Sequence, residues 1–213
     1  VMFEMLFPKE ASFVVKAYEE FTLQSATSIA ERFGRDTGHI SRVSSVALEI
    51  YDKMKKLHGY KLRERTLLQV SAILQDIGKY VNVRNHALLS YNTITNLDIV
   101  GINDHERLII ATVCYYHNGN IPSMDSPIYN QLSQEDRVMA SKLAAILQIS
   151  NAINTSHSPK FEQVSVNMKN GKLNIYLTTL KNINLEKWAF IAKTKLFREV
   201  YGLNATIIKR GVL

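Results

Sequence analysis

The sequence is poor in the features that mark several classes of protein. It holds one cysteine, Cys114, among 213 residues, which excludes an internal disulfide framework and a cysteine-rich zinc site and is typical of a reducing cytoplasm. No apolar run approaches the ~18 residues of a membrane-spanning helix. Glycine-rich phosphate loops and the Gly-x-Ser-x-Gly and His-Glu-x-x-His motifs are also absent. The chain therefore shows none of the usual short catalytic signatures, and we expect a cytoplasmic protein with no membrane partner.

The composition is that of an ordinary globular protein, with 46% hydrophobic and 21% charged residues, so a full core is expected. The net charge of +7 is unevenly spread, because residues 159–213 carry 10 Lys and Arg against 3 Glu while the preceding residues balance. A basic C-terminal unit indicates a polyanion partner or an acidic neighbouring domain. A solvated lysine-rich surface explains the same charge equally well. A nucleic-acid partner is not expected, because no helix-turn-helix or zinc signature accompanies the charge.

Hydrophobic periodicity predicts helices over most of the first 154 residues. The expected ranges are 8–33, 37–57, 62–76, 86–97, 104–116 and 134–154, with a loop over 118–131. In the second helix one apolar face holds Val43, Val46, Ile50, Met54 and Leu57. His39 falls on the same face and is expected to point inward, whereas His58 and His105 are expected at the surface near helix ends.

The pattern changes after Pro159. Two alternating segments, 164–168 and 173–177, flank Asn170-Gly171, which is a strong hairpin signal. A helix over 184–201 and a strand over 205–208 follow, and the helix is expected to turn Leu185, Trp188, Ala192 and Leu196 inward. We therefore predict a mainly α protein, with a helical domain over 1–158 and a small basic ββαβ unit over 159–213.

The most informative stretch is Leu74–Tyr80, where Gln75 and Asp76 close a buried helix and Gly78 follows. A carboxylate at the end of an apolar helix needs a partner, because an unpaired buried charge is costly. The candidate partners lie far away in the sequence: His39, His86, His117 and Asn151.

The order of His39, Gln75-Asp76 and Asn151 resembles the HD superfamily of helical metal-dependent phosphohydrolases, whose motif is a lone His, a His-Asp pair and a distal Asp. A narrower resemblance covers nearly the whole chain. It is to the C-terminal half of the exopolyphosphatase/guanosine pentaphosphate phosphohydrolase (Ppx/GppA) family. The stretches that carry it are Ala30–Gly34, His86 with Ser90-Tyr91, Tyr116-His117, and the closing unit with Trp188 and Leu196-Phe197. The resemblance implies an HD-domain-like helical bundle followed by the ββαβ unit.

The resemblance also implies a division of labour. In that family an upstream actin-like half carries the phosphate-binding loops, the Mg²⁺ site and the carboxylate that activates water. We expect such a half before Val1, so that this chain is an accessory part that binds polyphosphate or guanosine pentaphosphate and supports a homodimer. On this reading the isolated chain is not catalytic and holds no cofactor of its own.

The HD-like set departs from the superfamily pattern at two positions. Gln75 stands for the His of the pair and Asn151 for the distal Asp, so His39, Gln75, Asp76 and Asn151 offer fewer charges and fewer imidazoles than a working site. Because changes even outside the ligand shell weaken metal affinity about 10–100-fold, we expect no tight metal there. His39 and Asp76 would instead form a buried hydrogen-bonded pair, which the amides of Gln75 and Asn151 complete.

Two alternatives remain open from the sequence. His39, Asp76, His86 and His117 form a different ligand set, suited to an ion such as Zn²⁺. With such an ion the chain would be an autonomous HD phosphohydrolase acting on a nucleotide or a (p)ppGpp-like substrate. Lys79 and Arg84, with His86 and His117, are the candidate anion-binding residues for a polyphosphate chain.

Overall fold

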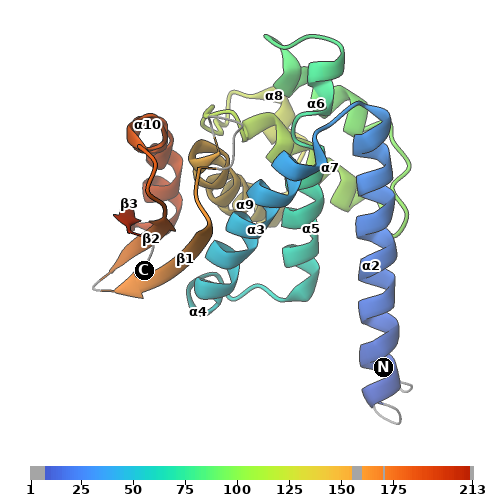
Figure 1. The fold of residues 1–213 in the computed structure, drawn as a ribbon. Helices are drawn as coiled ribbons and strands as arrows, with labels where there is room; N and C mark the ends of the chain where they lie inside the picture. Colours follow the sequence, from blue (N-terminus) through green and yellow to red (C-terminus); the bar gives the residue numbers. More distant parts are fainter. Residues whose placement is uncertain (1–7, 155–159, 170, 212–213) are drawn as a thin grey trace.

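The computed structural model describes residues 8–154, 160–169 and 171–211 (Figure 1). Its elements run in the order α2 (Pro8–Arg32), α3 (Thr37–Lys53), α4 (Lys55–His58), α5 (Leu62–Leu74), the 3-10 helix η1 (Ile77–Tyr80), α6 (His86–Ile94), α7 (Asp104–Tyr116), α8 (Pro127–Asn130), α9 (Gln134–Ile153), β1 (Gln163–Lys169), β2 (Lys172–Thr178), α10 (Asn184–Tyr201) and β3 (Asn204–Arg210). The mainly helical fold class with a small C-terminal α/β unit is confirmed. The expected domain boundary at residue 158 and Asn170 of the hairpin turn lie outside the described residues.

Helices α3, α5, α7 and α9 form the bundle that holds the core, and each packs against at least two of the others. Their fully buried side chains include Val43, Leu68, Ile110 and Leu147. Helix α2 packs along α5, and its first half extends beyond the bundle (Figure 1). No helix in the described part of the chain combines the length and apolar character needed to cross a bilayer.

The second helix begins as predicted, because the Asp36 side chain accepts a hydrogen bond from the Gly38 N–H at 2.9 Å. His39 is buried on its inner face, which confirms that expectation. The helix does not run to residue 57, however. It ends at Lys53 and resumes after Met54 as α4, and this break leaves Leu57 49% exposed.

The sequence analysis also predicts the wrong position for His58. The prediction of a surface position was wrong, because this side chain is only 6% exposed. Its ring lies beside those of Tyr51 and Tyr60. A second small difference concerns the expected loop over 118–131, where Pro127 begins the short helix α8.

The C-terminal unit is a three-stranded sheet in the order β1-β2-β3. Strand β1 pairs antiparallel with β2, whereas β3 lies parallel to β2 after the crossover through α10. The inward side chains of the sheet and the phenyl rings of α10 belong to the same core cluster as the helical bundle; they are Val166, Leu173, Ile175, Leu177, Phe190 and Phe197. Helix α10 packs against α9, so the unit is attached to the bundle through an extensive helix–helix contact.

The expected inner face of α10 is wrong in part. Leu196 is buried, but Ala192 is exposed and Leu185 and Trp188 are 48% and 72% exposed. The buried side instead carries Phe190 and Phe197. Two apolar rows run along this helix, and contact with α9 and the sheet selects the row with the phenyl rings.

Candidate functional site

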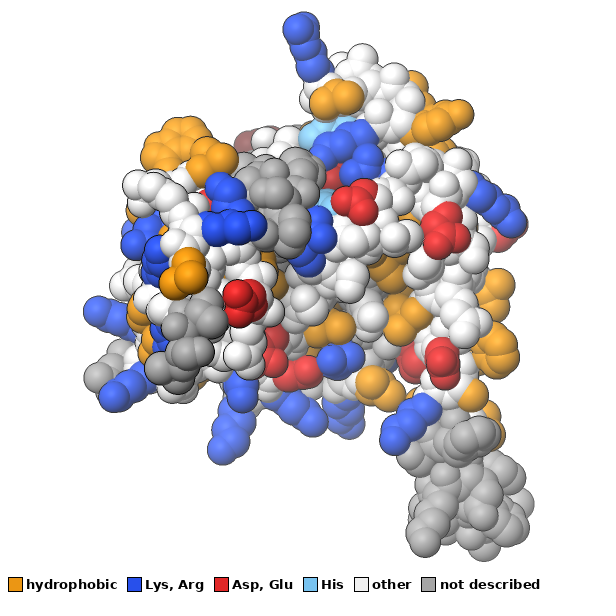
Figure 2. Space-filling model, viewed as in Figure 1, with side chains coloured by type: hydrophobic (Ala, Val, Ile, Leu, Met, Phe, Trp, Pro, Cys, Tyr) orange, Lys and Arg blue, Asp and Glu red, His pale blue; other side chains and the backbone are white. Residues whose placement is uncertain are grey.

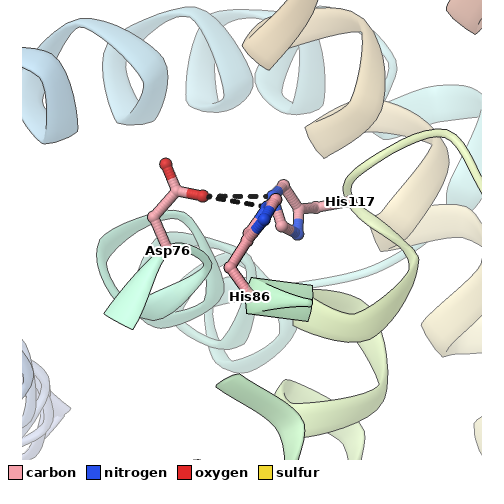
Figure 3. A group of neighbouring side chains, drawn as sticks. All are labelled: Asp76, His86 and His117. Atoms are coloured by element: carbon pink, nitrogen blue, oxygen red, sulfur yellow. Dashed lines mark ion pairs between the residues drawn. The ribbon is translucent and has the colours of Figure 1, made fainter. Parts of the chain in front are cut away.

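Three side chains from different parts of the bundle meet at its upper end (Figure 3). Asp76 lies between the end of α5 and η1, His86 is the first residue of α6, and His117 is the C-cap of α7. One ligand atom from each lies within 4.8 Å of those of the other two. All three side chains are buried, with 3%, 7% and 0% exposure respectively.

A close approach of backbones places Asp76 beside His86. The Gly78 N–H donates to Ser90 Oγ at 2.9 Å, and the Ser90 hydroxyl donates to the Gln75 carbonyl at 2.9 Å. A Cβ atom at Gly78 would overlap the carbonyl oxygen of His86. Glycine is therefore required here by the contact between η1 and α6.

The end of α7, which carries His117, is fixed by a buried amide. Gln148 of α9 donates through Nε2 to the Tyr116 carbonyl at 2.7 Å and to the Asn120 carbonyl at 2.8 Å. The Tyr116 carbonyl at the helix end has no partner within the helix, so the amide serves as its cap, and the same amide also holds the Asn120 carbonyl of the following loop.

Both imidazoles are oriented in the same way. His86 Nδ1 lies 2.8 Å from the Val83 carbonyl oxygen, and His117 Nδ1 lies 2.5 Å from the Cys114 carbonyl oxygen. Because a carbonyl only accepts, each Nδ1 carries the proton and each Nε2 is left facing Asp76. The two Nε2 atoms lie 3.5 Å and 3.3 Å from Asp76 Oδ1.

The other oxygen of Asp76 faces cations. Lys79 Nζ lies 2.7 Å and an Arg35 guanidinium nitrogen 3.4 Å from Oδ2. Burial by itself raises the pKa of Asp76, but His117 and Lys79 outweigh it and hold that pKa well below its usual range. The carboxyl group is therefore ionised. Burial also lowers the pKa of His86, which favours its neutral form.

A further cation comes from the C-terminal unit. Lys193 of α10 is half-buried; burial lowers its pKa, while Asp76 raises it and Lys79 lowers it. Its side chain runs close to Gly119, in the loop after α7. Figure 2 shows Lys and Arg side chains beside a small visible area of His side chain near the top of the view. The site therefore holds three cationic side chains, those of Arg35, Lys79 and Lys193, and one carboxylate, that of Asp76.

The structure brings together some of the predicted residues. Of the alternative metal set, Asp76, His86 and His117 converge, whereas His39 lies outside this group of ligand atoms in the described part of the chain. From the HD-like set, Gln75 is buried beside Asp76 and Asn151 is half-buried near the end of α9.

Of the candidate anion-binding residues, Lys79 contacts Asp76, while Arg84 is exposed on the η1–α6 connection. Arg35 was missed by the sequence analysis, and Lys193 was expected only as one of the basic residues of the C-terminal unit. Arg35 directly follows the Gly34 that ends the first helix, which is a weak signal. Lys193 carries no local signal, because only the packing of α10 on α9 brings it near Asp76.

The chain also matches a known protein family. The family model for Ppx/GppA phosphatase, domain III, matches residues 23–196. That range spans most of the chain and includes Arg35, Asp76, His86, His117 and Lys193. The chain therefore belongs to the Ppx/GppA phosphatase family, as a domain III of that family.

Proposed function

We propose that this chain is the accessory domain of a cytoplasmic Ppx/GppA phosphatase and that it holds the phosphate-rich substrate, polyphosphate or guanosine pentaphosphate. Bond cleavage would belong to an N-terminal actin-like half that carries Mg²⁺. The HD-like bundle would then serve as a binding scaffold. Membership of the Ppx/GppA family supports the assignment to a phosphatase of that family. The charge distribution around Asp76 supports the phosphate-binding role.

The observation that carries the proposal is the excess of cations at the site. Lys79 and Arg35 contact the single carboxylate of Asp76, and Lys193 lies near enough for Asp76 to raise its pKa. The side chains of Arg35 and Lys79 keep 15% and 22% exposure, so they are held in place yet reachable. Guanidinium and ammonium groups are the usual partners of phosphate oxygens. A bound phosphate would offset the repulsion between Lys79 and Lys193.

The test is binding of fluorescently labelled polyphosphate to the chain, measured by anisotropy. We expect Lys79→Gln and Lys193→Gln each to weaken binding about tenfold, the effect of one charge-assisted contact. Lys56→Gln is the matched control, because Lys56 is exposed on α4, at the other end of the bundle (Figure 1). Equal affinities for all three variants would refute the proposal. Guanosine pentaphosphate in place of polyphosphate then tests substrate preference.

The cluster of Asp76, His86 and His117 favours a second candidate, in which the chain itself hydrolyses phosphoanhydrides with a divalent ion. Phosphate release from polyphosphate or a nucleotide, with Mn²⁺, Mg²⁺ or Zn²⁺ added, tests it. A rate that His117→Gln abolishes would support hydrolysis by this chain. A rate unchanged in that variant would come from a contaminating enzyme and would count against it.

We further propose that the exposed apolar row of α10 contacts a second copy of the chain. Trp188 and Ile191 are 72% and 71% exposed, and Leu180 just before the helix is 77% exposed. Exposed aromatic and aliphatic groups of this kind are typical of interfaces. Sedimentation should show a dimer that Trp188→Ser with Ile191→Ser dissociates. Phe21→Ser, on the exposed side of α2, should leave the dimer intact, and a wild-type monomer would exclude the idea.

A further inference from the structure

The Asp76 cluster gathers three hydrogen-bond acceptors at one point. Each imidazole uses its Nδ1 proton on a backbone carbonyl, so in the neutral ring Nε2 presents a lone pair. Asp76 Oδ1 is an acceptor as well. Among the described residues, none of these three buried atoms has a hydrogen-bond partner. Facing acceptors of this kind are costly to bury unless a cation lies between them.

The spacing of the three atoms suits a small metal ion. Zinc binds imidazole nitrogen and carboxylate oxygen at about 2.0–2.2 Å in a tetrahedral arrangement, which separates neighbouring ligand atoms by about 3.3–3.6 Å. Asp76 Oδ1 lies 3.3 Å from His117 Nε2 and 3.5 Å from His86 Nε2. Neither pair makes a hydrogen bond, because Nε2 of a ring protonated at Nδ1 and a carboxylate oxygen are both acceptors. The geometry therefore fits ligands around a shared centre better than directly bonded partners.

The surroundings fix the ligands in the orientation that metal binding requires. Both histidines are held by the carbonyl three residues earlier, from Val83 and Cys114. Lys79 and Arg35 occupy Asp76 Oδ2 and leave Oδ1 directed at the imidazoles (Figure 3). Such outer partners set the tautomer and the position of metal ligands.

We propose that Asp76, His86 and His117 bind one transition-metal ion of the Zn²⁺ class. Two imidazoles and one carboxylate favour late first-row ions over Mg²⁺ and Ca²⁺, which prefer all-oxygen sites. Three protein ligands leave at least one coordination position for water or for a phosphate oxygen. This site shares Asp76 with the degenerate HD-like set but uses His86 and His117 in place of His39, Gln75 and Asn151. It is also independent of the proposed phosphate binding, since the ion binds without phosphate.

The test uses the untagged chain, stripped with a chelator and titrated with Zn²⁺ or Co²⁺ alone. We expect one ion per chain by calorimetry, and the visible absorption of tetrahedral Co²⁺. His117→Gln and His86→Gln should each weaken binding at least ~100-fold, because each removes a direct ligand. His105→Gln is the matched control: it also removes one histidine, but that side chain is 62% exposed and lies against Asp136.

Circular dichroism establishes that each variant is folded, and if one fails to fold, the other carries the test. Ion binding should also raise the thermal unfolding midpoint of the wild type and the control, and leave that of the two ligand variants unchanged. Binding well below one ion per chain, or equal affinity in all variants, would overturn the proposal and leave a shared proton at the cluster. Loss of polyphosphate binding with intact metal binding would sink only the proposed function.

Discussion

At the scale of single residues, the two oxygens of Asp76 have separate roles. Oδ2 faces Lys79 and Arg35, while Oδ1 faces the two imidazole Nε2 atoms. The expectation that this buried carboxylate needs partners is therefore confirmed. Its ion-pair partners at Oδ2 are Lys79 and Arg35. The carboxylate stays charged because His117 and Lys79 outweigh the effect of burial on its pKa.

His58, which is buried, is held in its neutral form by two hydrogen bonds. His58 Nε2–H donates to the Tyr51 carbonyl at 2.9 Å, and His58 Nδ1 accepts from the Tyr60 N–H at 3.0 Å. Protonation would place a hydrogen on the accepting nitrogen and break the second bond. Burial lowers the pKa of His58; Lys142 lowers it too, while the Tyr51 carbonyl, Glu64 and Asp52 raise it.

This environment predicts that His58 makes stability depend on pH. The unfolded chain takes up a proton at the ordinary pKa of about 6.5, whereas the folded chain does so only at lower pH. Because the unfolded state binds more protons below about pH 6.5, stability should fall as the pH drops through that value. Urea unfolding at several pH values measures this dependence of stability on pH. His58→Gln should flatten the profile relative to wild type, and parallel profiles would contradict the assignment.

At the scale of elements, the site depends on short connections between helices. Helix α5 ends at Leu74, η1 begins at Ile77, and α6 lies directly against η1. This tight path turns Asp76 toward the N-terminus of α6, where His86 begins the helix. The helix ends, and not the helix faces, therefore supply the site.

The contact between η1 and α6 leads to a prediction for Gly78. Gly78→Ala would drive a methyl group into the backbone of His86 and Ser90, and we expect a loss of about 1–3 kcal/mol in the free energy of unfolding. Gly211→Ala, where the added Cβ meets nothing within 4 Å, is the control and should change little. Denaturant unfolding of both variants provides the comparison. A Gly78→Ala variant as stable as wild type would show that the two elements can separate freely.

At the scale of the whole molecule, α9 and α10 join the helical bundle to the α/β unit. The Tyr201 hydroxyl of α10 donates to the Lys142 carbonyl of α9 at 3.1 Å, and Phe197 is fully buried beside Tyr201. Because the two parts share one core, they are expected to unfold together. The same packing brings Lys193 to the site.

Truncation of this junction should destabilise the entire chain. We expect Phe197→Ala to lower the free energy of unfolding by about 3–5 kcal/mol, through lost burial and a cavity. Phe21→Ala, at a side chain that is 62% exposed, should cost less than about 0.5 kcal/mol. Urea unfolding, followed by circular dichroism and by Trp188 fluorescence, should show one coincident transition. Separate transitions would mean that the bundle and the α/β unit fold independently.

The order and type of nearly all elements follow from the sequence, because helical periodicity, the Asp36 and Ser133 caps and the two alternating strands are local properties. The sequence analysis also named Asp76, His86 and His117, together with His39, as an alternative ligand set. The family resemblance was confirmed over residues 23–196.

Three features could not be read from the sequence: the buried side of α10, the inward position of His58, and the approach of Arg35 and Lys193 to the site. Each of these depends on contacts between segments distant in the sequence. Two apolar rows on one helix are equivalent until a partner helix covers one of them, and a lysine becomes part of a site only when packing brings it there. Long-range contacts also decide which ligands converge. Asp76, His86 and His117 come together, and His39 does not join them, because of how α5, η1, α6 and α7 meet.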